Sequence, residues 1–306
     1  AASVGGRAEL ATSFGSITFS EMRRDVTATG SNSSVSGRRV GQGVVVRTSF
    51  GPVELADVGG AVDVENSNGR ILVRDVRGGA KLATRFGEID ASGIGGDASV
   101  SNANGAIRLA HVGAAAEVHS GFGETNVTFV RKGLRIVSSN GNVTVADVGE
   151  AAFVRTSFGR VDVSRVGEEL TVENTNGGVR GADVRGNATV RTSFGPVTLE
   201  TVGGAVDVDS QNGAIDVRSV PARAGECGRI ALKTSFAPIR LALDPQGGYA
   251  VSARTSFGSV TTELPLAGDA AQTSGFLSGK IGDGRCEVRL TDSNGNIEIV
   301  KSTAAR

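Results

Sequence analysis

The sequence predicts an all-β protein built as a parallel β-solenoid. Phenylalanine recurs every 36 residues, and asparagine stands midway between successive phenylalanines, so the underlying unit is 18 residues long. A unit this short, rich in Val and Gly, cannot bury a core alone and must stack on copies of itself. The two series are Phe14, Phe50, Phe86, Phe122, Phe158 and Phe194, and Asn32, Asn68, Asn104, Asn140, Asn176 and Asn212.

Each 18-residue coil is expected to hold two strands with one buried face each. In the coil 51–68, apolar residues alternate over 52–58 and again over 61–68, and Gly59 and Gly60 stand between the two runs. Period-two alternation of β-branched residues is typical of half-buried strands. We therefore expect Val58, Val76 and Val112 to stack in one interior column. The preference of parallel crossovers for one hand favours a right-handed β-helix, although 18 residues per turn also matches left-handed hexapeptide helices. The alternation of Phe and Asn pairs the coils into 36-residue repeats.

The Phe and Asn positions lie at a corner of the coil. They share the pleat parity of Val46 and Val64, which predicts that both side chains point into the core. Phe then packs as a core plug, and Asn bonds the backbone of the turn. The alternative is an outward row of Phe rings, about 9.6 Å apart, that forms a binding strip.

An outward column just before this corner alternates in charge. It contains Arg47 and Glu65, and later Arg155, Glu173, Arg191 and Asp209. Opposite charges on neighbouring strands attract, and a slip by one coil would bring like charges together. We interpret the column as a ladder that fixes register on a solvated face.

The repeat divides the chain into a regular part, residues 1–220, and a less regular continuation, residues 221–306. After Val220 the pattern breaks, then returns at Phe236 and Phe257, and a cap-like end follows Leu264. Cys227 and Cys286 flank these irregular loops. They form a candidate disulfide, and the spacing leaves open whether they pair, since only the loops could bring them within about 7 Å.

Residue 1 falls inside a coil, because Ser3 to Gly6 aligns with Asp57 to Gly60. An uncovered first coil presents unpaired backbone groups. We expect an upstream segment to cover Val4 to Phe14, or that end to dock on another subunit as a dimer or head-to-tail fibre.

Composition argues against several classes of function. Lys plus Arg equals Asp plus Glu at 32 each, which disfavours binding to nucleic acid, and no apolar stretch is long enough to span a bilayer. His111 and His119 fall on different columns and suggest neither a metal pair nor a catalytic dyad. No catalytic, metal-binding or cofactor-binding residue is predicted. Trp is absent, so a sugar-stacking platform is hard to assemble.

The recurring Thr-Ser-Phe-Gly and Ser-Asn-Gly corners, for example at 48–51 and 67–69, resemble those of a bacterial adhesin-type family of β-strand-repeat proteins of unknown function. The ending at 278–284 and 293–297 is similar to the end of that family's chains. The resemblance implies an exported protein of the cell envelope and supplies no catalytic residues.

Taken together, these patterns predict a non-catalytic extracytoplasmic rod or scaffold for structure or adhesion. Its expected location is the periplasm, the cell surface or the medium, and its partner is an unidentified surface protein or glycan, with homo-oligomers through the coil ends as a further possibility. The alternatives are a self-assembling fibre subunit and a carbohydrate-active β-helix enzyme.

Overall fold

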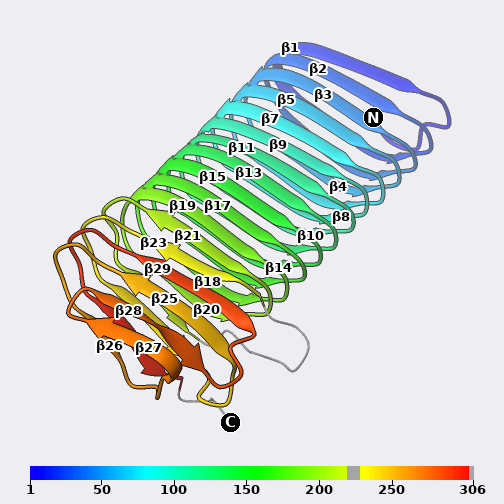
Figure 1. Ribbon diagram of the computed structural model, residues 1–306. Helices are drawn as coiled ribbons and strands as arrows, with labels where there is room; N and C mark the ends of the chain where they lie inside the picture. Colours follow the sequence, from blue (N-terminus) through cyan, green and yellow to red (C-terminus); the bar gives the residue numbers. More distant parts are fainter. Residues whose placement is uncertain (219–227, 303–306) are drawn as a thin grey trace. The chain divides into compact units, whose positions relative to one another are not determined.

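The protein is a parallel β-solenoid, as the sequence predicts. The computed structural model describes residues 1–218 and 228–302, which form strands β1 to β30 and no helix (Figure 1). The chain divides into two compact units, residues 1–150 and 151–306, and each is described by itself. No helix in the described part is long and apolar enough to cross a membrane.

In unit 1 the first two strands each run through both sides of a coil, and every later coil contains one longer and one shorter strand. The strands are β1 (Ala8–Met22), β2 (Val26–Val40), β3 (Val44–Phe50), β4 (Val53–Val58), β5 (Val62–Asn68), β6 (Ile71–Val76), β7 (Ala80–Phe86), β8 (Ile89–Ile94), β9 (Ala98–Asn104), β10 (Ile107–Val112), β11 (Ala116–Phe122), β12 (Thr125–Val130), β13 (Leu134–Asn140) and β14 (Val143–Val148).

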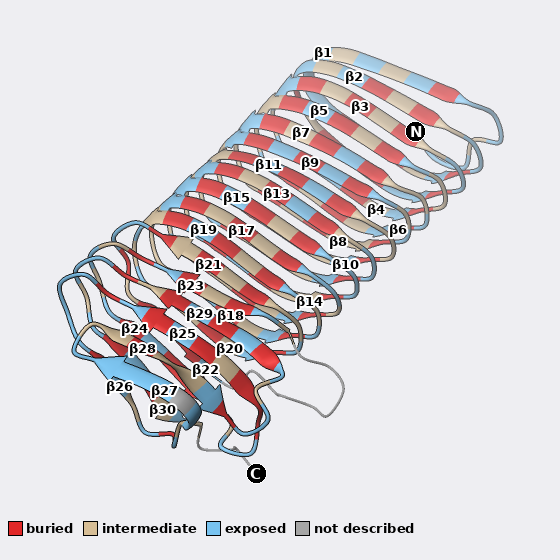
Figure 2. Cartoon of the chain, viewed as in Figure 1, coloured by how far each residue is buried: buried red, intermediate tan, exposed pale blue. Residues whose placement is uncertain are grey.

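In unit 1, each strand from β3 to β12 pairs in parallel with the strand one coil earlier and the strand one coil later. Val44 is opposite Val62, and Val62 is opposite Ala80, so the register advances by one 18-residue coil at each step. From β3 to β14, odd-numbered strands pair with odd-numbered ones and even-numbered strands with even-numbered ones, so they form the two sides of the coil. The core lies between these two sides, where buried side chains alternate with exposed ones (Figure 2).

The predicted interior column is confirmed. Val58 is opposite Val76, Val76 is opposite Ile94, and Ile94 is opposite Val112. All four are at most 2% exposed. The regular alternation of Val, Ile and Gly therefore fixes both the strands and their register.

A second corner of the coil has a left-handed backbone at a residue that is not glycine in most coils, with Gly93 as an exception. Asp57 has a φ of 56°, and the residues one and three coils later, Asp75 and His111, have φ of 53° and 55°. The left-handed residue is exposed, while the residues two before it and one after it, such as Leu55 and Val58, are both buried. One extra residue in the pleat thus lets Leu55 and Val58, which are three positions apart, both point into the core, as a β-bulge does.

Unit 2 begins with coils of the same kind. Its strands are β15 (Ala152–Phe158), β16 (Val161–Val166), β17 (Leu170–Asn176), β18 (Val179–Val184), β19 (Ala188–Phe194), β20 (Val197–Val202), β21 (Val206–Ser210), β22 (Ile215–Arg218), β23 (Ile230–Lys233), β24 (Ile239–Leu243), β25 (Tyr249–Arg254), β26 (Val260–Thr262), β27 (Ala267–Thr273), β28 (Phe276–Ile281), β29 (Cys286–Thr291) and β30 (Ile297–Lys301).

The C-terminal end of unit 2 is interleaved. Strand β29 lies between β23 and β25, and β30 lies between β24 and β26, so the last coil of the chain is inserted between two earlier coils. Strands β27 and β28 form an antiparallel hairpin on the outer edge of β25. The sequence shows an irregular end here, but not this order of strands.

The regular spacing of strands ends at Arg218, and the break at 221–227 lies outside the described residues. The compact units divide between residues 150 and 151, so the domain boundary expected at residue 220 stays a prediction.

Candidate functional site

The polar residues that stabilise the Phe and Asn corner lie two positions before Phe and Asn. Asn66 Nδ2 donates a hydrogen bond of 2.9 Å to the carbonyl of Gly51, which begins the same coil, and Asn66 Oδ1 accepts one of 3.2 Å from the Asn68 backbone N–H. In the coil before, the Thr48 hydroxyl donates to the Ser33 and Phe50 carbonyls. Both side chains are buried. Asn66 therefore makes the buried bonds of the corner, while the predicted backbone bond of Asn68 is a longer one, from Nδ2 to the Ser49 carbonyl at 3.5 Å.

The prediction that the Phe series forms part of the core is wrong. In unit 1, Phe14 is 75% exposed, and Phe50, Phe86 and Phe122 are 51–56% exposed. The paired Asn series is not core either, since Asn68, Asn104, Asn140 and Asn176 are half-buried, and Asn32 and Asn212 are exposed.

The reason is that the pleat ends before Phe. Thr48 is the last inward residue of its strand, and Ser49 and Phe50 both face solvent. Gly51 then turns the chain with a φ of 105°, a left-handed conformation that favours glycine. Strict alternation applies only along an extended strand, and the corner replaces it with two successive outward residues.

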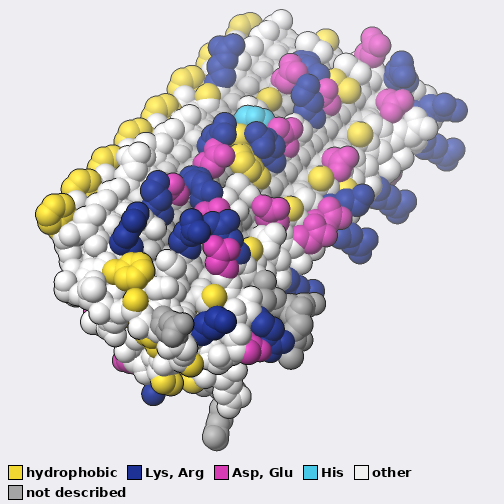
Figure 3. Space-filling view, in the orientation of Figure 1, with side chains coloured by type: hydrophobic (Ala, Val, Ile, Leu, Met, Phe, Trp, Pro, Cys, Tyr) yellow, Lys and Arg dark blue, Asp and Glu magenta, His cyan; other side chains and the backbone are white. Residues whose placement is uncertain are grey.

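The exposed rings form a row that we call the Phe ladder, made in unit 1 of Phe14, Phe50, Phe86 and Phe122. Register places an Asn between successive rings: Phe50 is opposite Asn68, and Asn68 is opposite Phe86. Figure 3 shows hydrophobic side chains regularly spaced along one edge. Rings of the ladder therefore stand two coils apart, about 9.6 Å.

Unit 2 carries a ladder of the same kind. Phe158 and Phe194 are 52% and 51% exposed, and Asn176 pairs with both. Phe236 and Phe257 are also exposed, each in a Thr-Ser-Phe corner. The Thr-Ser-Phe motif thus marks an exposed ring wherever it occurs.

A groove of about 710 Å³ lies beside the ladder of unit 1, on the face of the odd-numbered strands. Small residues such as Ala83, Ala103 and Gly121 form part of its lining. Its charged residues are mostly balanced, since Arg47 pairs with Asp63 at 2.8 Å and with Glu65 at 3.2 Å. These bonds raise the pKa of Arg47, chiefly through the hydrogen bond to Asp63. The guanidinium is thus held in place.

The predicted charge ladder is confirmed at two steps, Arg47 with Glu65 and Arg155 with Glu173, and shifted at another. Arg155 and Glu173 are opposite each other and form an ion pair of 2.5 Å. Arg191 instead pairs with Asp207 at 2.9 Å, and Asp209 pairs with Lys233 at 3.1 Å. An arginine is long enough to reach a carboxylate two positions from its direct partner, which pairing of adjacent positions alone does not anticipate.

The Toastrack DUF4097 family model matches residues 96–300, about two thirds of the chain. The chain belongs to the Toastrack family. No curated protein and no solved structure matches it. The match shows a β-repeat family of unknown function, and the adhesin role implied by the resemblance stays a prediction.

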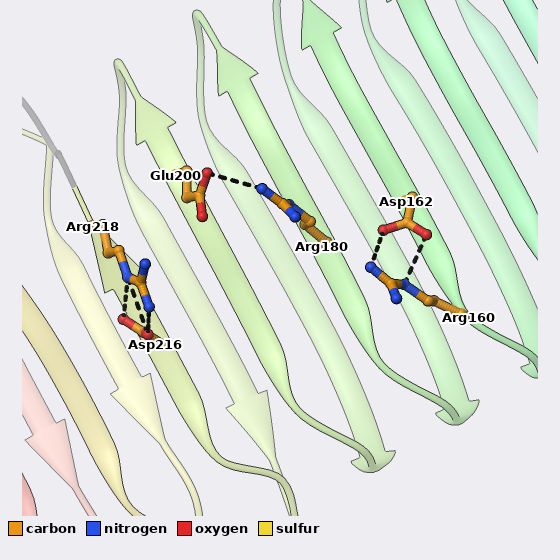
Figure 4. Close-up of polar contacts among 6 residues, drawn as sticks. All are labelled: Arg160, Asp162, Arg180, Glu200, Asp216 and Arg218. Atoms are coloured by element: carbon orange, nitrogen blue, oxygen red, sulfur yellow. Dashed lines mark hydrogen bonds and ion pairs between the residues drawn. The ribbon is translucent and has the colours of Figure 1, made fainter. Parts of the chain in front are cut away.

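Three further ion pairs lie along the even-numbered strands of unit 2 in this Toastrack chain (Figure 4). Arg160 binds Asp162 through two hydrogen-bonding atoms at 2.8 and 2.9 Å, and Arg180 binds Glu200 at 3.2 Å. Arg218 and Asp216 form a similar bidentate pair. These arginines and carboxylates neutralise one another, so the surface is charged without a strong local excess.

The two histidines of the Toastrack chain lie apart in the fold. His111 stacks on Phe129, with ring centroids 4.8 Å apart and an angle of 12° between the planes. His119 lies on β11 in the lining of the groove. Among the described residues, no three His, Cys, Asp or Glu side chains are placed to hold a metal ion.

Two further residues of the Toastrack chain have unusual surroundings. Cys286 is buried and disulfide-bonded. Cys227 lies outside the described residues, so the predicted bridge between Cys227 and Cys286 stays a prediction.

Asp292 occupies the corner position that Asn66 and Asn174 hold in other coils, and it is 3% exposed. Burial raises the pKa of this carboxyl, and its Oδ2 has no hydrogen-bond partner.

Proposed function

We propose that this Toastrack chain is a non-catalytic, extracytoplasmic scaffold for structure or adhesion, and that the Phe ladder is its binding surface. The exposure of the four unit 1 rings, each above half, is the observation that carries the proposal. Single exposed apolar residues are common on proteins, but a repeated row of aromatic rings is typical of an interaction site.

The scaffold supports this role through its rigidity. Each unit 1 ring is followed by a left-handed glycine, and at Phe50 a buried Thr two positions earlier, Thr48, bonds the Phe carbonyl. Thr84 and Phe86 repeat the same bond. A fixed backbone presents the rings at constant spacing, so that an extended partner meets several rings at once with little loss of conformational entropy.

Two observations support the other parts of the proposal. Disulfides persist in oxidising compartments, and the disulfide at Cys286 favours a location outside the cytoplasm. The charged side chains around the groove are engaged with one another, as Arg47 is with Asp63 and Glu65, which favours a structural rather than a catalytic use. The partner that we expect is a protein or a glycan of the cell surface.

The test is binding of the purified chain to cell-envelope material. The triple variant Phe50→Ser, Phe86→Ser, Phe122→Ser should keep the fold, because the rings are exposed, and should lose most of the binding. Phe129→Ser is the matched control, since Phe129 is 51% exposed but lies off the ladder. Equal binding by the wild type and the triple variant, or a chain found in the cytoplasmic fraction, would overturn the proposal.

A further inference from the structure

We infer that the Phe ladder pairs with the ladder of a second copy of this chain, with the rings of one copy inserted between the rings of the other. This inference rests on the proposed use of the ladder as a binding surface and names its partner. It concerns a lateral contact along the corner and is independent of the coil ends.

The spacing of the rings is the first argument. Aromatic pairs form when ring centroids are about 4.5 to 7 Å apart. Rings one coil apart meet this condition, as His111 and Phe129 do at 4.8 Å. Ladder rings stand two coils apart, at about 9.6 Å, which is too far for contact within one copy. A ring placed midway between two of them would lie about 4.8 Å from both.

The residue at the midpoint leaves room for such a ring. Asn68 stands between Phe50 and Phe86 and is half-buried, whereas both rings are more than half exposed. Its side chain leans toward the backbone, with Nδ2 3.5 Å from the Ser49 carbonyl oxygen of the preceding coil. Large and small side chains therefore alternate along the corner, and this profile is complementary to itself when shifted by one coil.

The groove side of the ladder permits close approach of two copies, while the opposite side carries Arg70, Glu88 and Glu124, two positions after Asn68, Phe86 and Phe122. The column beside the ladder, on the side of the groove, is small and neutral at Ser49, Ser67, Ala103 and Gly121, with Arg85 as its charged member between them. In a two-fold contact, residues near the axis meet their own copies, so a neutral strip there avoids repulsion between like charges. The space-filling view shows mostly uncharged atoms around the row of hydrophobic side chains (Figure 3).

A two-fold axis across the corner satisfies the geometry. Such a contact uses the same patch on both copies, and each ring of one ladder meets a notch of the other. A Phe side chain offers about 200 Å², so four half-exposed rings contribute about 400 Å² per copy, or about 800 Å² in total. This area is below that of standard stable complexes, and the dimer is therefore expected to be weak and concentration-dependent.

The test measures self-association of the full chain by sedimentation velocity over a range of concentrations. The wild type should dimerise reversibly. Phe50→Ser with Phe86→Ser should raise the dissociation constant about tenfold or more, since buried aromatic anchors dominate such contacts. Asn68→Phe with Asn104→Phe gives the sharper result: it adds apolar surface but fills the notches, and it should also weaken the dimer.

Thr144→Phe is the matched control, because it adds a ring at an exposed site on β14, away from the ladder, and should leave the dimer unchanged. Tighter association of the Asn→Phe variant would indicate unspecific stickiness and overturn the inference. So would a monomeric wild type, or a dimer indifferent to both ladder variants. If the wild type is monomeric but the ladder variants still lose envelope binding, the inference fails and the proposed function stands. If the dimer depends on the ladder but the ladder variants bind the envelope as the wild type does, the inference stands and the proposed function fails.

Discussion

The regular coils of unit 1 and the interleaved end of unit 2 both pair their strands in parallel, but the paired strands differ in how far apart they lie in the sequence. In unit 1, paired residues such as Val44 and Val62 are 18 positions apart in sequence. At the end of unit 2, Ile230 pairs with Val288, 58 positions away, and Tyr249 pairs with Cys286, 37 positions away. Parallel strand pairing thus joins consecutive coils in one region and segments that are distant in the sequence in the other.

This difference separates two kinds of stability. A stack of nearest-neighbour coils gains stability coil by coil, and the loss of one coil affects mainly those beside it. The interleaved end requires β29 and β30 to be in place before β25 and β26 can pair with the rest of the sheet, which makes it cooperative. Long-range pairing also forms more slowly. We therefore expect the end of unit 2 to behave as one all-or-none element.

The largest effect is expected from removing the last coil. Deletion of residues 287–306 takes away most of β29 and all of β30, so β25, β26 and the β27–β28 hairpin lose the strands that connect them to β23 and β24. Hydrogen exchange over residues 249–281 should rise to nearly the level of an unfolded chain. Deletion of residues 1–25, which removes β1, is the control and should leave β3 and later strands protected. Continued protection of 249–281 would show that the end does not depend on the inserted coil.

A smaller effect is expected from cavities in the two regions. Leu82→Ala in β7 and Leu290→Ala in β29 each remove a side chain that is 1% exposed, and each should lower the free energy of unfolding by about 2 to 5 kcal/mol. The regions should differ in how far the change spreads. Hydrogen exchange should rise only in neighbouring coils for Leu82→Ala, but across β25, β28 and β29 together for Leu290→Ala. A confined change in both variants would contradict an all-or-none end.

The corner position of Asp292 gives a third comparison, because other coils use Asn there. Asp292→Asn supplies an amide that can donate as Asn66 Nδ2 does, and should stabilise the chain by about 1 kcal/mol at neutral pH. Asn66→Asp should destabilise it by about 1 to 3 kcal/mol, since the buried carboxylate would face a carbonyl oxygen. Thermal melting of both variants measures the two effects.

The pH dependence of Asp292→Asn follows from the raised pKa of Asp292. The folded state holds the proton more tightly than the unfolded state, so the wild type is most stable below the ordinary carboxyl pKa of about 4 and loses this contribution as pH rises through the higher folded pKa. The stabilising effect of Asp292→Asn should therefore vanish at low pH. An effect that is constant from acidic to neutral pH would mean that the carboxyl titrates normally.

The smallest effect is expected from surface ion pairs, and it should be similar in both regions. Arg155→Ala removes the pair with Glu173 in a regular coil, and Arg229→Ala removes the looser pair with Glu287, at 3.9 Å, near the end. Each should cost less than about 1 kcal/mol and become smaller at high salt. A large loss for Arg229→Ala alone would mean that charge, rather than the inserted coil, holds the end together.

The sequence predicts the architecture well because the signal is repeated. The column of Val and Ile residues that contains Val58 and Val76 continues in coil after coil, and a single register aligns all its members. The outward position of Phe50 could not be read from parity, because the pleat rule fails once the chain bends at Gly51. The clue was chemical: Thr48 and Asn66 can bond the corner from inside, which leaves the ring no place in the core.

The interleaved end was beyond sequence reasoning for a different reason. Alternation identifies β29 as a strand but carries no information about its partners, since any parallel neighbour with an apolar inner face satisfies it. The insertion of β29 between β23 and β25 depends on the path of the loops that lead the chain back to that position. The same limit applies to Arg191, whose partner is chosen by the reach of its side chain.

The two-coil period of the Phe ladder also restricts how such a chain can lengthen by gene duplication. Duplicating one 18-residue coil preserves every core column but places two rings or two amides in adjacent coils, and the ladder beyond that point falls out of phase. Duplicating 36 residues keeps both the core and the surface in phase. Selection on the interior alone would tolerate growth by single coils, whereas selection on the ladder admits growth only in pairs. From Phe14 to Phe194 the steps are all of 36 residues, the spacing that growth by pairs of coils would produce.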